Sequence, residues 1–391
     1  MAFDAFCERV RAVGRLGIDT EFVGEGRYRT LLCVIQVVVS DDEGLEVVVL
    51  DALEQDLDLA PLASLLADPQ IEVIVHAGRQ DVALLRRCAR TEVTRIFDTQ
   101  VAAGFAGLSA QAGYDTLLRE VLGVRVQKTA SYTRWDRRPL DAEQLAYARE
   151  DVLHLLDLAS ELERRLDAHG RMGWALEECR YLESVSDVRE VDSVFARLPR
   201  INSLSPAARA IARELVAWRE QLAEQQDRPV TTVLNDAALV ELAKRAPRSA
   251  DALEQVRGVN PGSLRRRGGD LLATIARGAA QPPIPVDIER HEPSTPFDGP
   301  QIALAEALVR ARALEAGLAY ELVAARADLA AVVACVRVGA PEPDVRTLSG
   351  WRRELVGEEL IAMLRGERSL AVGRGGKLAI SESEPAASAT A

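Results

Sequence analysis

The chain has 391 residues, of which 48% are hydrophobic and 28% are charged, and its formal net charge is −12. That length predicts two or three domains, and the composition excludes a disordered chain and an integral membrane protein. No apolar run approaches the roughly 20 residues of a transmembrane helix, no signal-peptide pattern opens the sequence, and the five widely spaced cysteines include no CxxC pair. We therefore expect a cytoplasmic protein without a disulfide framework or a zinc site.

The first 190 residues alternate strand-like and helix-like segments. Strands are predicted at 16–22, 31–39, 45–50 and 71–76, and helices at 58–67, 79–89 and 141–165. Asp141 and Gln144 have the spacing of a capping box at the start of the last of these helices. This order of elements predicts an α/β domain over residues 1–190, with a mixed sheet flanked by helices.

Beyond residue 200 the strand pattern stops, and the chain is predicted to be all-α. Amphipathic helices are expected at 206–227, 236–246, 249–256, 261–265 and 269–277. We assign a first helical domain to 201–280 and a second to 300–370. Five prolines between 281 and 299 predict an extended linker, and the Gly-, Ser- and Ala-rich residues 371–391 predict a disordered tail.

Positive charge is concentrated in the first helical domain. Residues 201–280 carry 12 basic and 9 acidic side chains, against 24 and 35 in residues 1–200 and 12 and 16 in residues 281–391. A surface that binds phosphates is therefore expected there. Its best candidate is Arg265-Arg266-Arg267, predicted to lie in a turn flanked by glycines, although a run of solvated surface charge is the alternative.

Two carboxylates share one face of the first predicted strand. Asp19 and Glu21 alternate along it, so both side chains project to the same side, about 7 Å apart along the backbone. Such a pair is self-repelling and costly to bury, and a divalent cation is the simplest compensation. The same spacing at Asp56 and Asp58 lies outside any strand and is expected to be solvated.

Two further motifs follow. Asp81 falls in the first turn of a helix that starts after His76-Ala77-Gly78, where the helix dipole favours a carboxylate. Tyr147 and Asp151 are four residues apart on a predicted helix and therefore share one face. Taken singly, each also fits a structural role, and His76 in particular fits a hydrogen-bonded structural histidine.

Together, in the order D-x-E, D, Y-x-x-x-D, these residues resemble the tyrosine subtype of the DEDD superfamily of 3′–5′ exonucleases. Residues 76–81 (HAGRQD), 113–124 (GYDTLLREVLGV) and 147–152 (YAREDV) are similar to the ribonuclease D family. In that family a ribonuclease H-like exonuclease domain precedes two helical HRDC-type domains. Residues 209–278 are similar to the first of these, and 351–355 (WRREL) to the end of the second.

The resemblance implies catalysis by two Mg²⁺ or Mn²⁺ ions about 3.5–4 Å apart, without an organic cofactor. Asp19 would bridge both ions, Glu21 and Asp151 would bind the ion that carries the attacking water, and Asp81 would reach the other ion largely through water. Tyr147 would hold that water and deprotonate it. The family implies an exoribonuclease that trims RNA 3′ ends, tRNA precursors among them, and releases 5′-nucleoside monophosphates.

Candidate nucleic-acid contacts lie around these motifs. Aromatic or apolar groups near Phe22 would wedge the terminal base, and His76 is a separate candidate contact. Lys128, Arg137 and Arg138 would bind phosphates, and a solvated basic loop is the alternative.

Two other functions remain possible on the sequence: a 3′–5′ DNA exonuclease with the same chemistry, and an inactive nucleic-acid-binding adaptor. The presence of all four carboxylates and the tyrosine argues against the adaptor. No membrane and no obligate protein partner is implied.

Overall fold

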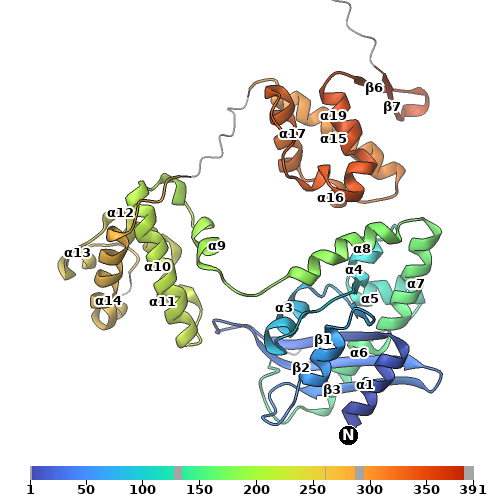
Figure 1. Cartoon of the computed structure of the whole chain (residues 1–391), viewed down its shortest axis with the longest axis horizontal. Coiled ribbons are helices and arrows are strands. Elements are labelled where there is room, and N and C mark those ends of the chain that lie inside the picture. The colour runs from blue at the N-terminus through green and yellow to red at the C-terminus, as the bar shows by residue number, and fades with distance from the viewer. Residues whose placement is uncertain (1, 127–133, 260, 287–294, 383–391) are drawn as a thin grey trace, which may run out of the picture.

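The computed structural model describes residues 2–126, 134–259, 261–286 and 295–382 (Figure 1). An α/β domain comes first in the chain and two helical units follow it. In the described ranges no helix combines the length and the hydropathy of a membrane span.

A five-stranded mixed sheet, in the order β3-β2-β1-β4-β5, forms the α/β domain. Its strands are β1 (Arg15–Val23), β2 (Leu31–Asp41), β3 (Gly44–Asp51), β4 (Glu72–Val75) and β5 (Ile96–Asp98). The first three pair antiparallel, and β4 and β5 add in parallel. The predicted mixed sheet is confirmed. The sequence missed β5 because three residues are too few for a pattern.

Helices cover both faces of the sheet. On one face lie α1 (Ala2–Val13), α2 (Ala60–Leu66) and α3 (Arg79–Cys88), and on the other lie α4 (Thr99–Phe105), α6 (Ala142–Leu153) and α7 (Leu155–Ala168). Leu16 and Ile18 of β1 are buried in the first layer. Because side chains alternate along a strand, Asp19 and Glu21 face the layer of α6 and α7.

The helix predicted from 141 to 165 is divided in two by His154, whose φ of −109° and ψ of 9° end α6 and precede α7. The predicted capping box is present, since Asp141 accepts from Gln144 N while the Gln144 side chain accepts from Asp141 N. The sequence pattern continues across the break because the apolar residues on either side fit one helical period. The break leaves Asp151 in the last turn of α6.

The α/β domain is completed by α5 (Tyr114–Leu117) and α8 (Met172–Arg180). Short helical turns lie at Leu118–Leu122, Tyr181–Ser184, Ile201–Ser203, Arg346–Leu348, Arg353–Gly357 and Arg374–Gly376.

The first helical unit contains α9 (Val191–Ala196), α10 (Pro206–Gln225), α11 (Val230–Val233), α12 (Asp236–Arg245), α13 (Ala250–Glu254) and α14 (Pro261–Ala280). Its core includes Phe195, so it begins before the predicted boundary at 201. The predicted Gly-flanked turn at 265–267 is wrong, because α14 is one continuous helix. Glycine weakens a helix interior by about 1 kcal/mol, and here buried Leu271 and Ile275 hold the helix in the core.

The second helical unit contains α15 (Asp298–Glu315), α16 (Tyr320–Val323), α17 (Arg326–Val338), α18 (Gly350–Arg352) and α19 (Glu358–Leu364). It shares one apolar cluster with the α/β domain. Trp351 lies at the centre of the contact, 5.0 Å from the ring of Phe105 and 5.2 Å from that of Trp174.

After α19 the chain forms an antiparallel hairpin of β6 (Arg368–Val372) and β7 (Leu378–Glu382). The predicted disordered tail is therefore wrong for residues 371–382, because alternating apolar residues pair across the glycine turn. The remaining tail residues lie outside the described ranges. Of the predicted linker, residues 281–286 and 295–297 are described without regular structure, and α15 begins one residue earlier than the predicted end.

Candidate active site

Three carboxylates from two elements meet at the end of β1. Asp19 and Glu21 extend from β1 and Asp151 from α6, and one carboxylate oxygen of each lies within 4.8 Å of the others. The sequence predicted that Asp19 and Glu21 share a face. The structure adds that the last turn of α6 brings Asp151 onto the same face.

A β-bulge follows directly after Glu21. Glu21 pairs with Val34, whereas Phe22 pairs with Leu32, so the register of β1 against β2 shifts between the two residues. A bulge bends its strand and redirects the side chains beyond it. Phe22, predicted to contact the terminal base, lies beyond this bend and is half-buried.

Asp81 is held from the opposite face of β1. It lies in the first turn of α3, is only 8% exposed, and accepts a hydrogen bond of 2.5 Å from the Thr20 hydroxyl. It does not belong to the group within 4.8 Å. Its charge nevertheless acts on Asp19, whose pKa is raised by burial and then by Asp81. The structure thus brings all four predicted carboxylates to one end of β1.

Asp98 is a site-building residue that the sequence analysis missed. It is buried, caps α4, and accepts hydrogen bonds from Ala77 N (3.0 Å) and Gly78 N (2.9 Å). These bonds hold the turn that leads into α3 and therefore into Asp81. Ala77 adopts a φ of +51°, which is uncommon for a residue other than glycine. The N-cap signal of Asp98 is visible in the sequence, but its contact with residues 77 and 78 is not.

His76 sits in the same turn. Its Nδ1 lies 2.9 Å from the Thr99 hydroxyl, and its ring centroid is 5.5 Å from that of Tyr114. Burial lowers the pKa of His76, so the imidazole is neutral at physiological pH. These contacts are those of a hydrogen-bonded structural histidine, the alternative that the sequence left open.

The negative charges of these carboxylates are not neutralised by positively charged side chains in the part of the chain that the structure describes. Burial raises the pKa of Glu21 to about 8, helped by Asp151 and Asp81, and burial raises the pKa of Asp151 to about 7. The pKa of Asp19 is raised well above its ordinary value. Like charges at this separation destabilise one another unless a proton or a cation intervenes. An all-oxygen donor set with excess negative charge fits a hard divalent ion such as Mg²⁺ or Mn²⁺.

Tyr147 adjoins the three carboxylates. Its hydroxyl hydrogen-bonds to Asp151, and its ring centroid lies 6.0 Å from that of the buried Trp135. Burial and the charges of Asp151, Glu21 and Asp19 raise the pKa of this phenol. In the metal-free protein the hydroxyl is therefore protonated at neutral pH and donates a hydrogen bond to Asp151. The role of proton acceptor stays a prediction.

The residues predicted to bind phosphates differ in their surroundings in the structure. Arg138 pairs with Asp51 and donates to Trp135 O (2.7 Å) and Cys33 O (2.9 Å), so it fastens its loop to the sheet. Arg137 is exposed, and Lys128 lies outside the described residues. On α14, Arg265 and Arg266 are exposed, whereas Arg267 donates to the Gln226 side chain at 2.9 Å.

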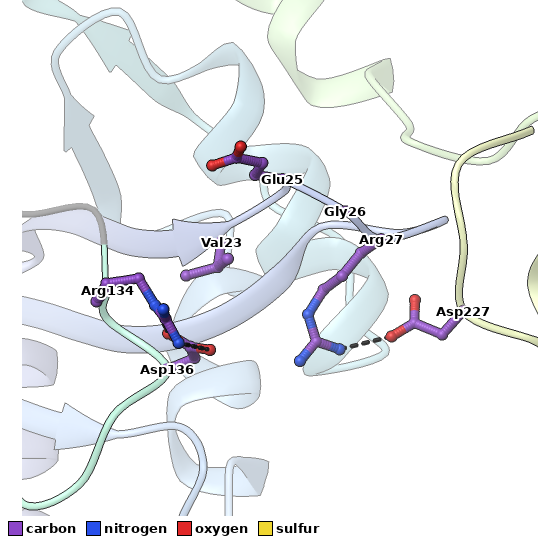
Figure 2. A pocket seen from close by; sticks show the side chains of 7 residues that line it. All are labelled: Val23, Glu25, Gly26, Arg27, Arg134, Asp136 and Asp227. Carbon is purple, nitrogen blue, oxygen red and sulfur yellow. Dashed lines mark hydrogen bonds and ion pairs between the residues drawn. The ribbon is translucent and has the colours of Figure 1, made fainter. Parts of the chain in front are cut away.

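A pocket of about 550 Å³ lies just beyond the C-terminal end of β1, between the α/β domain and the first helical unit (Figure 2). Two guanidinium groups line it, each held by one carboxylate. Arg27 bonds to Asp227 at 2.6 Å, and Arg134 bonds to Asp136 at 3.0 Å. The sequence could not reveal this pocket, because residues 27 and 227 meet only through the packing of two domains.

The β1–β2 loop makes further polar contacts with α10. The Tyr28 hydroxyl lies 3.1 Å from Glu220, and Arg29 bonds to Glu224 at 2.6 Å. Burial and Glu220 raise the pKa of Tyr28 to about 12. The loop that follows β1 thus brings the first helical unit close to the carboxylates.

Comparisons with known proteins agree with this geometry. A family model described as a 3′–5′ exonuclease matches residues 1–167, and an HRDC domain model matches residues 208–275. The second predicted HRDC-type domain, at 300–370, is helical as expected, but its assignment to that family stays a prediction.

The chain is 35% identical over 373 residues to ribonuclease D of Granulibacter bethesdensis, covering 94% of this chain and 92% of that protein. It is 34% identical over 367 residues to ribonuclease D of Gluconacetobacter diazotrophicus, covering 93% and 91%. The crystal structure of Escherichia coli RNase D, an exoribonuclease involved in structured RNA processing, superposes with a TM-score of 0.80 at 28% identity. That match covers 93% of this chain and 96% of the E. coli chain.

Proposed function

Because the chain belongs to the ribonuclease D family and is a 3′–5′ exoribonuclease, we propose that it trims the 3′ ends of structured RNAs, tRNA precursors among them. The products are 5′-nucleoside monophosphates, released one at a time. One observation carries the proposal: Asp19, Glu21 and Asp151 converge within 4.8 Å beside the Tyr147 hydroxyl. The role of the E. coli relative in structured RNA processing supports the substrate class.

Two divalent ions, Mg²⁺ or Mn²⁺, would be held by the four carboxylates. Asp19, Glu21 and Asp151 form one donor group, and Asp81 lies on the other side of Asp19. When bound, such ions neutralise the scissile phosphate and lower the pKa of the attacking water. The positions of the carboxylates would determine where the ions bind. Asp98 keeps Asp81 in position through the turn before α3.

Tyr147 would orient the attacking water. Its phenol is protonated, since burial and three carboxylates raise its pKa. A protonated hydroxyl can hold a water or a phosphate oxygen by a hydrogen bond but cannot take the water's proton. In this proposal Tyr147 positions the nucleophile, and Glu21 and Asp151 would hold the ion that lowers the pKa of that water.

The single-stranded 3′ end would reach the site past Phe22 and the pocket of Figure 2. Arg27 and Arg134 are the guanidinium groups of that pocket, and each could exchange its carboxylate for a phosphate of the strand. Arg137 is exposed beside Arg138 and is the remaining candidate from the sequence. We place the enzyme in the cytoplasm, with RNA as the partner it requires.

The test compares a 3′-extended tRNA with a DNA of matched sequence, each labelled at the 5′ end, with Mg²⁺ or with EDTA. The proposal predicts stepwise 3′ shortening of the RNA, abolished by EDTA, and slower shortening of the DNA. Equal or faster cleavage of DNA would favour the DNA exonuclease alternative. Binding of both without any cleavage would favour the inactive adaptor.

A further inference from the structure

Gln36 is a buried polar residue in an otherwise apolar strand. It lies in the middle of β2, where every residue from Leu32 to Val39 is buried, and its side chain is 0% exposed. Within the described part of the chain, neither the oxygen nor the nitrogen of its amide has a hydrogen-bond partner. Buried amides without partners are rare because they lose their bonds to water without replacement.

The strand register places this amide beside a catalytic carboxylate. Gln36 is the direct cross-strand partner of Asp19 on β1 and of Val49 on β3. Side chains of directly opposed residues point to the same face, with Cβ atoms about 4.5–5.5 Å apart. Val34 and Val38 flank Gln36 on that face of β2, and both are buried.

The same face is covered by α6. This helix packs on β1, β2 and β3, and its Ala148 and Val152 are fully buried. Four residues flank Gln36 on this face of the sheet: Val34 and Val38 along β2, and Asp19 and Val49 across it. Asp19 is the polar one among these four. An amide can donate two hydrogen bonds, whereas an ionised carboxylate can only accept them.

We infer that Gln36 is a positioning residue for Asp19, donating its amide N–H to the Asp19 carboxylate when that carboxylate holds a divalent ion. This inference rests on the proposed metal site. A carboxylate that binds a metal ion keeps lone pairs that can accept a hydrogen bond. A donor from the protein that binds these lone pairs fixes the orientation of the carboxylate. An amide supplied from a rigid central strand holds that orientation more closely than a loop would.

The stability of the protein gives a way to separate this role from packing. If Gln36 only filled space, an apolar side chain of the same shape would do so better, since it leaves no polar atom unpaired. Gln36→Met keeps the length and the unbranched form of the side chain and removes the amide. Val49→Ala is the matched control, because it loosens the packing on the other side of Gln36 and leaves the amide in place.

The experiment measures the melting temperature in EDTA and the dissociation constant for Mn²⁺ by calorimetry, for the full chain and its variants. Gln36→Met should melt in EDTA at or above the wild-type temperature and bind Mn²⁺ about 10–100-fold more weakly. Its kcat on a short RNA should fall while its KM stays near that of the wild type. Val49→Ala should melt lower and bind Mn²⁺ as the wild type does.

Wild-type Mn²⁺ affinity in Gln36→Met would overturn the inference. So would a lower melting temperature in EDTA with unchanged affinity, which would show that the amide is structural. Should the methionine variant not fold, Gln36→Leu is measured in the same way, and failure of both to fold would likewise show a structural amide. If the wild type itself binds no Mn²⁺, the proposed metal site fails, an outcome distinct from failure of the Gln36 inference alone.

Discussion

At the scale of single residues, the site is an arrangement of carboxylates that the protein alone does not neutralise. Glu21 and Asp151 have pKa values raised to about 8 and about 7 by burial first of all. Elsewhere in the described chain, carboxylates such as Asp41 and Asp51 are paired with arginine, and their pKa values are lowered. The contrast marks the end of β1 as the place built for a cation.

The raised pKa values predict how stability depends on pH without metal. A carboxyl group whose pKa is higher in the folded state contributes no penalty below about pH 4 and a full penalty above its folded pKa. In EDTA the protein should therefore lose stability as the pH rises from about 4 to about 8, by on the order of a few kcal/mol. Mg²⁺ should restore it mainly at the upper end, where the ligands are deprotonated.

The control for this prediction is Glu21→Gln, which removes one of the raised groups. The difference in melting temperature between wild type and variant, in EDTA, should change in the variant's favour as pH rises from about 4 to about 8. Groups shared by both proteins, such as His76, cancel from that difference. A difference that is constant with pH would contradict the assigned electrostatics.

Tyr147→Phe tests the tyrosine. The variant keeps the ring beside Trp135 and loses the hydroxyl bonded to Asp151. Its kcat should fall on the order of 10²-fold, because the attacking water is no longer held in place, while RNA binding stays close to that of the wild type. Single-turnover cleavage and filter binding measure the two separately, and full activity of the phenylalanine variant would refute the role.

At the scale of elements, the local motifs could be predicted and their partners could not. Strand alternation places Asp19 beside Glu21, and helix spacing places Tyr147 beside Asp151, so both pairs follow from a few neighbouring residues. Asp98 and Gln36 act on the same site through a turn and a strand register, which depend on contacts that no local pattern shows. The bulge after Glu21 and the break at His154 are also set by packing.

The continuous helix α14 changes what the arginine run can do. Successive residues of a helix are rotated by about 100°, so Arg265, Arg266 and Arg267 fan over more than half the helix circumference. At most two of them can then face one RNA backbone. Replacing all three by alanine should reduce the slope of log K against log salt by about 0.7 to 1.4.

The matched control is Arg164→Ala, which removes one arginine from α7, where it pairs with Glu161. It should leave the slope as in the wild type. A slope in the triple variant that equals the wild-type slope would place the RNA path elsewhere, with Arg27 and Arg134 as the next residues to replace.

At the scale of the whole molecule, the two helical units contact the α/β domain through different kinds of interaction. The second unit shares an apolar core with the α/β domain, with Trp351 packed between Phe105 and Trp174 and Arg352 paired with Glu178. The first unit meets the β1–β2 loop mainly through polar contacts, among them the pair Arg27–Asp227, whose side chains are 32% and 50% exposed. One ring from that loop, Tyr28, packs against the core of the unit. The apolar contact is therefore expected to carry far more stability.

Two single variants compare these attachments. Trp351→Ala should lower the free energy of unfolding by about 3–5 kcal/mol, because it leaves a cavity in a buried core. Arg27→Ala should cost less than about 1 kcal/mol, as exposed ion pairs do. Denaturant titration of both variants checks the order, and similar losses would contradict it.

The central claim is that the carboxylates at the end of β1 catalyse removal of nucleotides from RNA 3′ ends. The most direct measurement follows a 5′-labelled single-stranded RNA in Mg²⁺ with wild-type protein and with Asp151→Asn, which removes one charge from the converging group. We predict a ladder that shortens from the 3′ end with the wild type and intact RNA with the variant. Intact RNA with the wild type, or the same ladder with both proteins, would contradict the account.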